Sequence, residues 1–421
     1  MFTVTPSQNL YYLRPGQNRL QTVLSVQVDK TNPGTKARLA VGIVLDRSGS
    51  MEGKKIQAAR EGAIKVLHAL DEETTFVVVS FNELAQVLYG PAPGTKEHKR
   101  RAIAAVQAVQ AGRGTCMSTA LNAAVDALGQ DQTRASKILF LTDGKNESEA
   151  RQVLAQAVQR CAQAQISVHA WGVGTDWDAA ELRHIADVTY GSADIIPTPQ
   201  QIEAAFLAAF SQIRQTTITN ARLVLWSPVG VALKEMQQVF PRIMVLGWEQ
   251  DPTNAQQKIV SLGTFAAGEQ RDYLLELEVP VAASGQQFLM LRPGTRYFTA
   301  GLGEQEEKSA RQQWVFAEWT ENLALAAQLD SQVAHYTHQE ELSQAILAGQ
   351  EALAAGDRSR ATKLLGLALE ISQRTGNEQM TKLLGNLVQR DSNGTLRLNP
   401  EADAVARQTL AIHAGRTTRL L

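Results

Sequence analysis

Between residues 38 and 214 the chain alternates between short apolar runs and segments with helical spacing. The first run, LAVGIVL, is continuously apolar, which is expected for a parallel strand covered on both faces. The segments between the runs, such as KKIQAAREGAIKVLHAL, place apolar residues three and four positions apart, which predicts amphipathic helices. This β-α rhythm predicts an α/β domain with a doubly wound, mostly parallel sheet.

The chain on both sides of this α/β region is predicted to form strands. Residues 1–33 include the alternating run LQTVLSVQV, and NPG at 32–34 predicts a turn. After Thr216 the helical spacing stops, and short strand-like runs separated by Gly, Pro and Asn follow. Such runs are typical of a β-sandwich. Residues 1–33 and 217–300 together would complete one sandwich, into which the α/β domain is inserted.

From Lys308 onward the chain is rich in Ala, Leu and Gln and is predicted to be helical. One segment resembles a helical hairpin of tetratricopeptide type with Gly356-Asp357 at its turn, and a three-helix packing module explains it equally well. The expected division of the chain is N-terminal sandwich strands at 1–36, the α/β domain at 37–215, the sandwich at 216–303, the helical module at 304–392 and a C-terminal tail at 393–421.

Composition narrows the class of protein. The 421 residues are 44% hydrophobic and 20% charged with a net charge of -1, so no overall field favours nucleic acid. The two cysteines, Cys116 and Cys161, argue against a disulfide framework and fit a reducing compartment. No run approaches the roughly 20 apolar residues of a membrane span. The start, MFTVTPSQNLYYL, does not resemble a signal peptide, so we expect a cytoplasmic protein.

Oxygen-bearing side chains gather where the predicted strands end. Asp46, Ser48 and Ser50 follow the first run in VLDRSGSM, Asp143 follows KILFLT, and Thr115 precedes a helix in GRGTCMSTAL. In open α/β sheets ligands bind at the carboxyl ends of the strands. Hydroxyl and carboxylate oxygens suit Mg²⁺, with Mn²⁺ or Ca²⁺ as alternatives, rather than zinc. The alternative is a purely structural role in which Asp46 and Ser48 only cap the next helix. Thr115 and Asp143, at the same edge of the sheet, favour a metal site instead.

The pattern D-x-S-x-S … T … D resembles the metal-ion-dependent adhesion site, or MIDAS, of von Willebrand factor type A (VWA) domains. The resemblance implies that Ser48 and Ser50 bind the ion directly, and that Thr115 does so when a ligand is present and through water otherwise. It implies that Asp46 and Asp143 act through waters and hydrogen bonds to the serines. Such a nearly neutral ligand set leaves the ion able to attract an Asp or Glu carboxylate from a partner.

The whole chain resembles known arrangements of this domain. A type A domain inserted in a β-sandwich resembles the integrin β inserted domain within its hybrid domain. The C-terminal helices and the ending AGRTTRLL resemble a group of bacterial VWA proteins, whose relatives often accompany kinases, phosphopeptide-binding domains or AAA+ ATPases. The predicted function is therefore an intracellular, metal-dependent protein-binding module. An enzyme is not expected, because no set of nucleophile, base and orienting group is visible.

Three other functions follow from the same site. The chain could be an adaptor subunit for an AAA+ ATPase, as in chelatase and MoxR-type systems. It could self-associate, with a neighbouring copy supplying the carboxylate. Or it could be a hydrolase in which Asp46 and Asp143 activate metal-bound water, which needs a general base close to the ion. Only Glu52 is near in sequence.

Two further groups of side chains are expected to have structural roles and not to form binding sites. His335 and His338 lie three apart on a predicted helix, but without a nearby acidic or His cluster they are expected to be solvated or hydrogen-bonded. Trp314, Phe316 and Trp319 are expected to pack between the helical module and the rest of the chain.

The last helix of the α/β region is expected to transmit a signal. It presents Ile202, Phe206, Ala209 and Ile213 on one apolar face and leads with almost no linker into a sandwich strand beginning near Ala221. In related domains with this kind of site, ligand binding draws the threonine onto the ion and the last helix slides. A similar movement here would change the angle between the domains.

Overall fold

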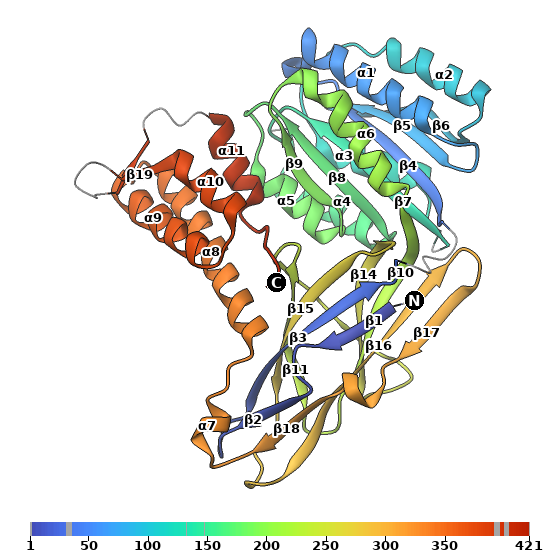
Figure 1. The fold of residues 1–421 in the computed structure, drawn as a ribbon. Coiled ribbons are helices and arrows are strands. Elements are labelled where there is room, and N and C mark those ends of the chain that lie inside the picture. The colour runs from blue at the N-terminus through green and yellow to red at the C-terminus, as the bar shows by residue number, and fades with distance from the viewer. Residues whose placement is uncertain are drawn as a thin grey trace.

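The computed structural model describes residues 2–30, 36–131, 133–146, 148–390, 396–399 and 404–420. The turn predicted at 32–34 lies outside these residues. The described chain forms an α/β domain, a β-sandwich beside it, and a helical module that packs along both (Figure 1).

The α/β domain is built on one six-stranded sheet in the order β6-β5-β4-β7-β8-β9, in which only β6 runs antiparallel to its neighbour. This arrangement confirms the predicted doubly wound, mostly parallel sheet. The strands are β4 Arg38–Asp46, β5 Thr75–Phe81, β6 Ala85–Pro93, β7 Arg134–Thr142, β8 Ile166–Val173 and β9 Ser192–Ile196. After its first residue β4 is wholly buried, because helices cover both faces of the sheet.

Helices α1, α2 and α6 cover one face of this sheet, and α3, α4 and α5 cover the other (Figure 1). Gly62 lets α1 and α6 approach closely, because a Cβ there would lie 3.1 Å from Ile202. The short connection from α6 to the next strand spans only residues 214–215. The helices are α1 Lys54–Ala69, α2 Lys96–Gln107, α3 Met117–Leu128, α4 Arg151–Gln163, α5 Ala179–Val188 and α6 Ile202–Ile213.

The β-sandwich has two sheets, in the orders β1-β3-β15-β11-β12 and β13-β14-β10-β16-β18-β2, with β17 paired to β16. Strands that precede the α/β domain pair with strands that follow it in both sheets: β3 pairs with β15, and β2 pairs with β18. The α/β domain is therefore inserted into the sandwich, as predicted. The strands are β1 Phe2–Pro6, β2 Leu10–Leu13, β3 Arg19–Val28, β10 Thr216–Trp226, β11 Ala232–Phe240, β12 Met244–Val245, β13 Glu249–Gln250, β14 Gln257–Ala266, β15 Gln270–Glu278, β16 Gln287–Thr299, β17 Gly303–Lys308 and β18 Val315–Trp319.

The prediction that the chain is helical from Lys308 onward is wrong for residues 315–319, which form β18 and extend the sandwich beyond residue 303. VFAEW in β18 alternates buried and half-buried residues, which is a strand pattern. Trp319 is fully buried in the sandwich core, and its Nε1 donates a hydrogen bond to the carbonyl oxygen of Gln17 at 3.1 Å. The aromatic group therefore belongs to the sandwich and does not join it to the helical module.

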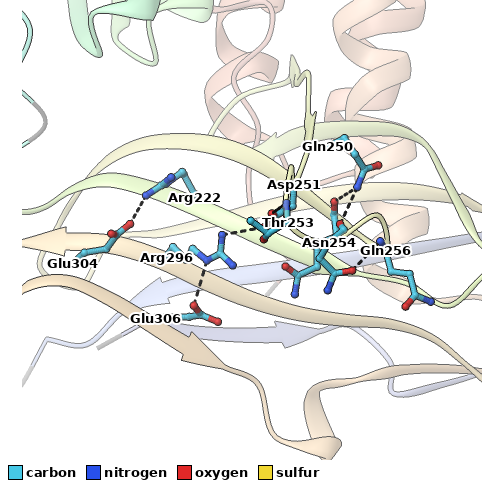
Figure 2. A network of polar contacts seen from close by, with 10 residues as sticks. Arg222, Gln250, Asp251, Thr253, Asn254, Gln256, Arg296, Glu304 and Glu306 are labelled. Carbon is cyan, nitrogen blue, oxygen red and sulfur yellow. Dashed lines mark hydrogen bonds and ion pairs between the residues drawn. The ribbon is translucent and has the colours of Figure 1, made fainter.

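A polar network holds the loop after β13 against the sandwich (Figure 2). Asp251 is buried and accepts hydrogen bonds from the backbone of Thr253 at 2.8 Å and from Nη1 of Arg296 at 3.1 Å. Arg296 also pairs with Glu306 on β17 at 3.3 Å. The network fixes the edge of the sheet, and we assign it a structural role.

The helical module contains α7 Leu323–Ala326, α8 Ser331–Ala354, α9 Arg358–Arg374, α10 Glu378–Leu387 and α11 Ala404–His413, with β19 Val388–Arg390 and β20 Leu396–Leu398. The predicted turn between α8 and α9 is present. Gly356 adopts a positive φ of 79°, which favours glycine, and Asp357 caps α9 by accepting a hydrogen bond from the backbone of Arg360 at 2.9 Å. Buried residues of α8, α9, α10 and α11 share one core.

The prediction of a C-terminal tail at 393–421 is wrong for residues 404–420. Helix α11 packs on α5 and β9 of the α/β domain, and the residues after it continue along all three parts (Figure 1). Arg416 pairs with Asp194 on β9 at 2.8 Å, and the backbone of Thr417 donates to the carbonyl of Pro241 in the sandwich at 3.0 Å. The carbonyl of Thr418 contacts Nε2 of His335 on α8 at 2.7 Å. These partners are distant in sequence, so local composition did not reveal them.

Candidate metal site at the strand switch point

The candidate site lies where β4 and β7 end side by side. From β4 the chain turns to β5 on one side of the sheet, and β7 returns to pair with β4 on the other. In open α/β sheets such a reversal of strand order marks the usual ligand position, at the carboxyl ends of the two strands. Asp46 is the last residue of β4, and Asp143 follows the last residue of β7.

Asp46 shapes the loop after β4. One carboxylate oxygen accepts the backbone N–H of Ser48 at 2.7 Å, and the other accepts the hydroxyl of Thr142 at 2.6 Å. The side chain is fully buried, and this burial raises the pKa of Asp46 to about 6 even though both hydrogen bonds oppose the shift. Because protein donors occupy both oxygens, Asp46 is placed to orient the serine loop.

Asp143 gathers the two serine hydroxyls. Its Oδ1 accepts the hydroxyl of Ser50 at 2.6 Å and that of Ser48 at 3.4 Å, and the two hydroxyl oxygens lie 3.1 Å apart. Asp143 and Ser48 are buried, whereas Ser50 is exposed. The cluster therefore opens to solvent on the Ser50 side.

Thr115 reaches the same cluster from a separate loop. A Cβ at Gly144 would lie 3.4 Å from the hydroxyl oxygen of Thr115 and 3.5 Å from that of Ser50, so both oxygens border one small space. Hydrogen bonds anchor the loop: the backbone of Cys116 donates to the carbonyl of Asn82 at 2.8 Å. All five residues singled out in the sequence thus converge at one edge of the sheet.

The chemistry of these side chains fits a hard divalent cation. Three hydroxyl oxygens and the carboxylate of Asp143 border the space, and such oxygens suit Mg²⁺, Mn²⁺ or Ca²⁺. Within the described part of the chain, no three His, Cys, Asp or Glu side chains are grouped as a metal site would need. A cation at this edge would therefore depend on the hydroxyl groups.

Lys55 is a site residue that the sequence reasoning missed. Its ammonium, on the second residue of α1, forms an ion pair with Oδ2 of Asp143. The Lys55 side chain is 27% exposed, while that of Asp143 is fully buried. The signal in the sequence was a lysine in the first turn of the helix that follows the serine loop.

Glu149 was missed as well. Its carboxylate accepts the backbone N–H of Ser118 at 2.9 Å, the thiol of Cys116 at 3.1 Å and the hydroxyl of Ser118. Glu149 lies in the segment after β7 and thereby caps the start of α3. A helix N-terminus favours such a negative charge. Burial, and then the bond to Glu149, raise the pKa of the Cys116 thiol, so this cysteine is not an activated nucleophile.

The two histidines of α8 have separate hydrogen-bonding or ion-pair partners, in agreement with the prediction that they are solvated or hydrogen-bonded. His335 contacts the carbonyl of Thr418 at 2.7 Å, and His338 pairs with Glu341 at 3.2 Å. They form no joint metal site among the described residues.

The fold is that of a protein with a von Willebrand factor type A domain, and residues 39–195 match the family model of that domain. An uncharacterised protein of the cyanobacterium Synechocystis is 26% identical over 67% of each chain. The inter alpha-trypsin inhibitor heavy chain 4 of mouse is 31% identical over 34% of this chain, but that match covers only 16% of the mouse protein.

Solved structures extend the similarity beyond the VWA domain. The structure described as von Willebrand factor type A from Catenulispora acidiphila is 27% identical, with a TM-score of 0.90 over 100% of this chain and 97% of that one. The ArnB paralog VWA2 from Sulfolobus acidocaldarius is 14% identical with a TM-score of 0.64 over 99% and 98%, which shows the fold alone. The insertion of the VWA domain in the sandwich, with the helices after it, is therefore a shared architecture.

In the described ranges, no helix combines the length and the apolar character needed to cross a membrane.

Proposed function

We propose that this protein binds a partner protein through a divalent metal ion, with Mg²⁺ as the first candidate. Ser48, Ser50 and Thr115 would hold the ion, and Asp46 and Asp143 would orient the hydroxyls. The observation that carries the proposal is the convergence of three hydroxyl oxygens beside the buried Asp143 at the strand switch point. The VWA domain, a common protein-interaction module, supports it.

The bound ion would supply an electrophilic position for a carboxylate. Hydroxyl ligands are neutral, so they leave most of the ion's charge uncompensated. The site opens on the side of the exposed Ser50, where an Asp or Glu of a partner can approach. The partner is thus predicted to be a protein with an accessible acidic residue, and a second copy of this chain meets that description.

We propose that the chain acts by binding and not by catalysis. A hydrolase would need a general base beside the ion. The carboxylate of Glu149 is engaged by Ser118 and Cys116, and Glu52 is exposed to solvent. Cys116 and Cys161 are both free and buried, which fits the reducing cytoplasm that we propose as its compartment.

Metal binding is tested by calorimetry with Mg²⁺, Mn²⁺ and Ca²⁺. Asp143→Ala should abolish the binding heat while the circular dichroism spectrum is unchanged, because the site lies at the rim of the sheet. Asp126→Ala is the matched control, since Asp126 is an exposed aspartate of α3 that pairs with Arg160. Equal Mg²⁺ affinity in Asp143→Ala and the control would refute the site.

Partner binding is tested by affinity capture with the wild type and with Ser48→Ala, each with Mg²⁺ and with EDTA. The proposal requires that both the variant and EDTA release the partner, and that replacing one acidic residue of the partner does the same. Capture of an AAA+ ATPase would specify the adaptor role. A partner retained equally in EDTA and by Ser48→Ala would show that the interface lies elsewhere.

A further inference from the structure

A cavity of about 330 Å³ lies between the VWA domain and the sandwich, away from the metal site. It is bordered by residues of β7 and β8, the end of α6, and β14 and β15 of the sandwich. Its volume falls within the range of small-molecule sites, which is about 300–1,000 Å³. The charged side chains of the lining are Lys137, Arg242 and Arg271, together with one carboxylate, that of Glu269, and the lining also contains His169.

Lys137 on β7 carries a buried positive charge without a direct ion pair among the described residues, although the charge of Glu269, which pairs with Arg271, acts on it from the same cavity lining. Only 5% of the residue is exposed, and its ammonium contacts two neutral groups, the hydroxyl of Ser167 at 3.3 Å and the hydroxyl of Thr264. Across the residues that the structure places, none of the ion pairs includes Lys137. An ammonium has three N–H donors, so one remains for a ligand.

The arginines of the lining already have acidic partners. Arg242 pairs with Asp187 at 3.2 Å, and Arg271 pairs with Glu269 at 2.6 Å. The opposite charges within each of these two pairs cancel, so the positive charge of Lys137 is the net charge of the lining. A buried charge without a partner is costly, and an anion in the cavity would remove that cost.

His169 on β8 provides a second unpaired polar atom. Its Nδ1 lies 2.8 Å from the hydroxyl of Ser192, while its Nε2 is shielded from solvent and has no hydrogen-bond partner. Burial lowers the pKa of His169 to about 3, so the ring is neutral. The tautomer that accepts the hydroxyl of Ser192 at Nδ1 carries its proton on Nε2, where it can donate to a ligand.

We infer that this cavity binds a small molecule through a phosphate group, which accepts hydrogen bonds from Lys137 and from Nε2 of His169. A phosphate offers several strong acceptor oxygens and a negative charge that matches the excess charge of the lining. The volume leaves room for an organic part beside the phosphate. Because residues of both the VWA domain and the sandwich line the cavity, the ligand would bridge the two.

The state of Lys137 at neutral pH supports the inference. Burial, and then the charge of Arg271, lower its pKa to about 8 against the opposing charge of Glu269, so the ammonium is still charged at pH 7. Binding is therefore expected to weaken above pH 8, where Lys137 loses its proton.

The inference is tested by titrating the full chain with orthophosphate, glycerol 3-phosphate and acetate in calorimetry, at matched ionic strength. Lys137→Met and His169→Gln are compared with Lys96→Met, which removes an exposed lysine at the start of α2, outside the cavity. Methionine retains most of the aliphatic stem without the buried charge, so Lys137→Met should fold, and a thermal melt checks this.

The wild type and Lys96→Met should bind at least one of the two phosphates and bind acetate more weakly. Lys137→Met should bind phosphate at least about ten-fold more weakly, the loss expected for one charge-assisted hydrogen bond. Binding of glycerol 3-phosphate alone would identify an organic phosphate as the ligand class, and binding of both would identify the phosphate group itself. No phosphate binding, equal binding by Lys137→Met, or acetate bound as tightly as phosphate would each overturn the inference.

Discussion

Lys55 and Asp143 form an ion pair at the candidate metal site, and the other oxygen of the same carboxylate accepts the hydroxyl of Ser50 at 2.6 Å. The buried Asp143 is thus shared between an ammonium and the hydroxyl cluster. A divalent ion bound by the hydroxyls would lie close to this ammonium, and the two positive charges would repel each other.

Lys55→Met is therefore expected to tighten Mg²⁺ binding. Removing one nearby positive charge should gain about 1 kcal/mol, or about five-fold in affinity, because the pair is only partly screened by solvent. Calorimetry measures the change, and Lys54→Met is the control, since Lys54 is the exposed neighbour in the same helical turn. Weaker binding in Lys55→Met alone would show that the lysine organises Asp143 for the ion.

Phe206 on α6 is expected to hold the resting position of that helix. Its ring is fully buried and lies 5.5 Å from the ring of Trp171 on β8. Phe206→Ala should lower the free energy of unfolding by about 3–5 kcal/mol. If the resting position holds the ring more tightly than the ligand-bound position does, the variant should also bind the acidic partner more tightly.

The control for this prediction is Phe265→Ala, which removes an equally buried ring from the sandwich core. It should destabilise the chain without changing partner affinity. Small-angle scattering with and without Mg²⁺ and partner then reports the angle between the VWA domain and the sandwich. If the angle is unchanged and Phe206→Ala binds the partner no more tightly, the site binds its partner without moving α6 and the predicted conformational change is refuted.

The buried Lys137 predicts a pH-dependent stability. Its pKa falls from 10.5 to about 8 on folding, so between these values the unfolded chain binds more protons than the folded chain. Stability from this group therefore rises with pH across that window. Lys137→Met should be more stable than the wild type at pH 7, and this advantage should shrink by about 3 kcal/mol by pH 10.5. Urea unfolding at both pH values measures it; a constant difference would contradict the shift.

Arg416 is expected to hold the C-terminal segment on the VWA domain. Burial opposes ionisation of Asp194, but His413 and Arg416 outweigh it and lower its pKa. Arg416→Gln should destabilise the docked segment by about 1 kcal/mol, because the pair is partly exposed. Hydrogen exchange should quicken in α11, and Arg358→Gln, an exposed arginine at the start of α9, should leave it unchanged. Unchanged exchange in Arg416→Gln would show that the apolar face of α11 suffices.

The architecture was largely predictable because it follows from short-range patterns. A period of two or of 3.6 residues reports which face of a segment is buried, and continuous apolar runs such as β4 report burial on both faces. Patterns fail where a strand is short and follows polar turns, as β18 does after Arg311–Gln313. There the neighbouring strands β16 and β2 decide the conformation.

The sequence alone determined the convergence of the five candidate site residues, since parallel strands end at one edge and each of these residues lies at the end of a strand, just after one, or just before a helix. Only the tertiary structure decided that Lys55 pairs with Asp143, that the C-terminal segment joins all three parts, and that Lys137 lies in a cavity without a direct ion pair among the described residues. Each of these depends on side chains brought together from distant positions. Local periodicity reports whether a residue is buried, but it carries no information on which distant charge lies beside it.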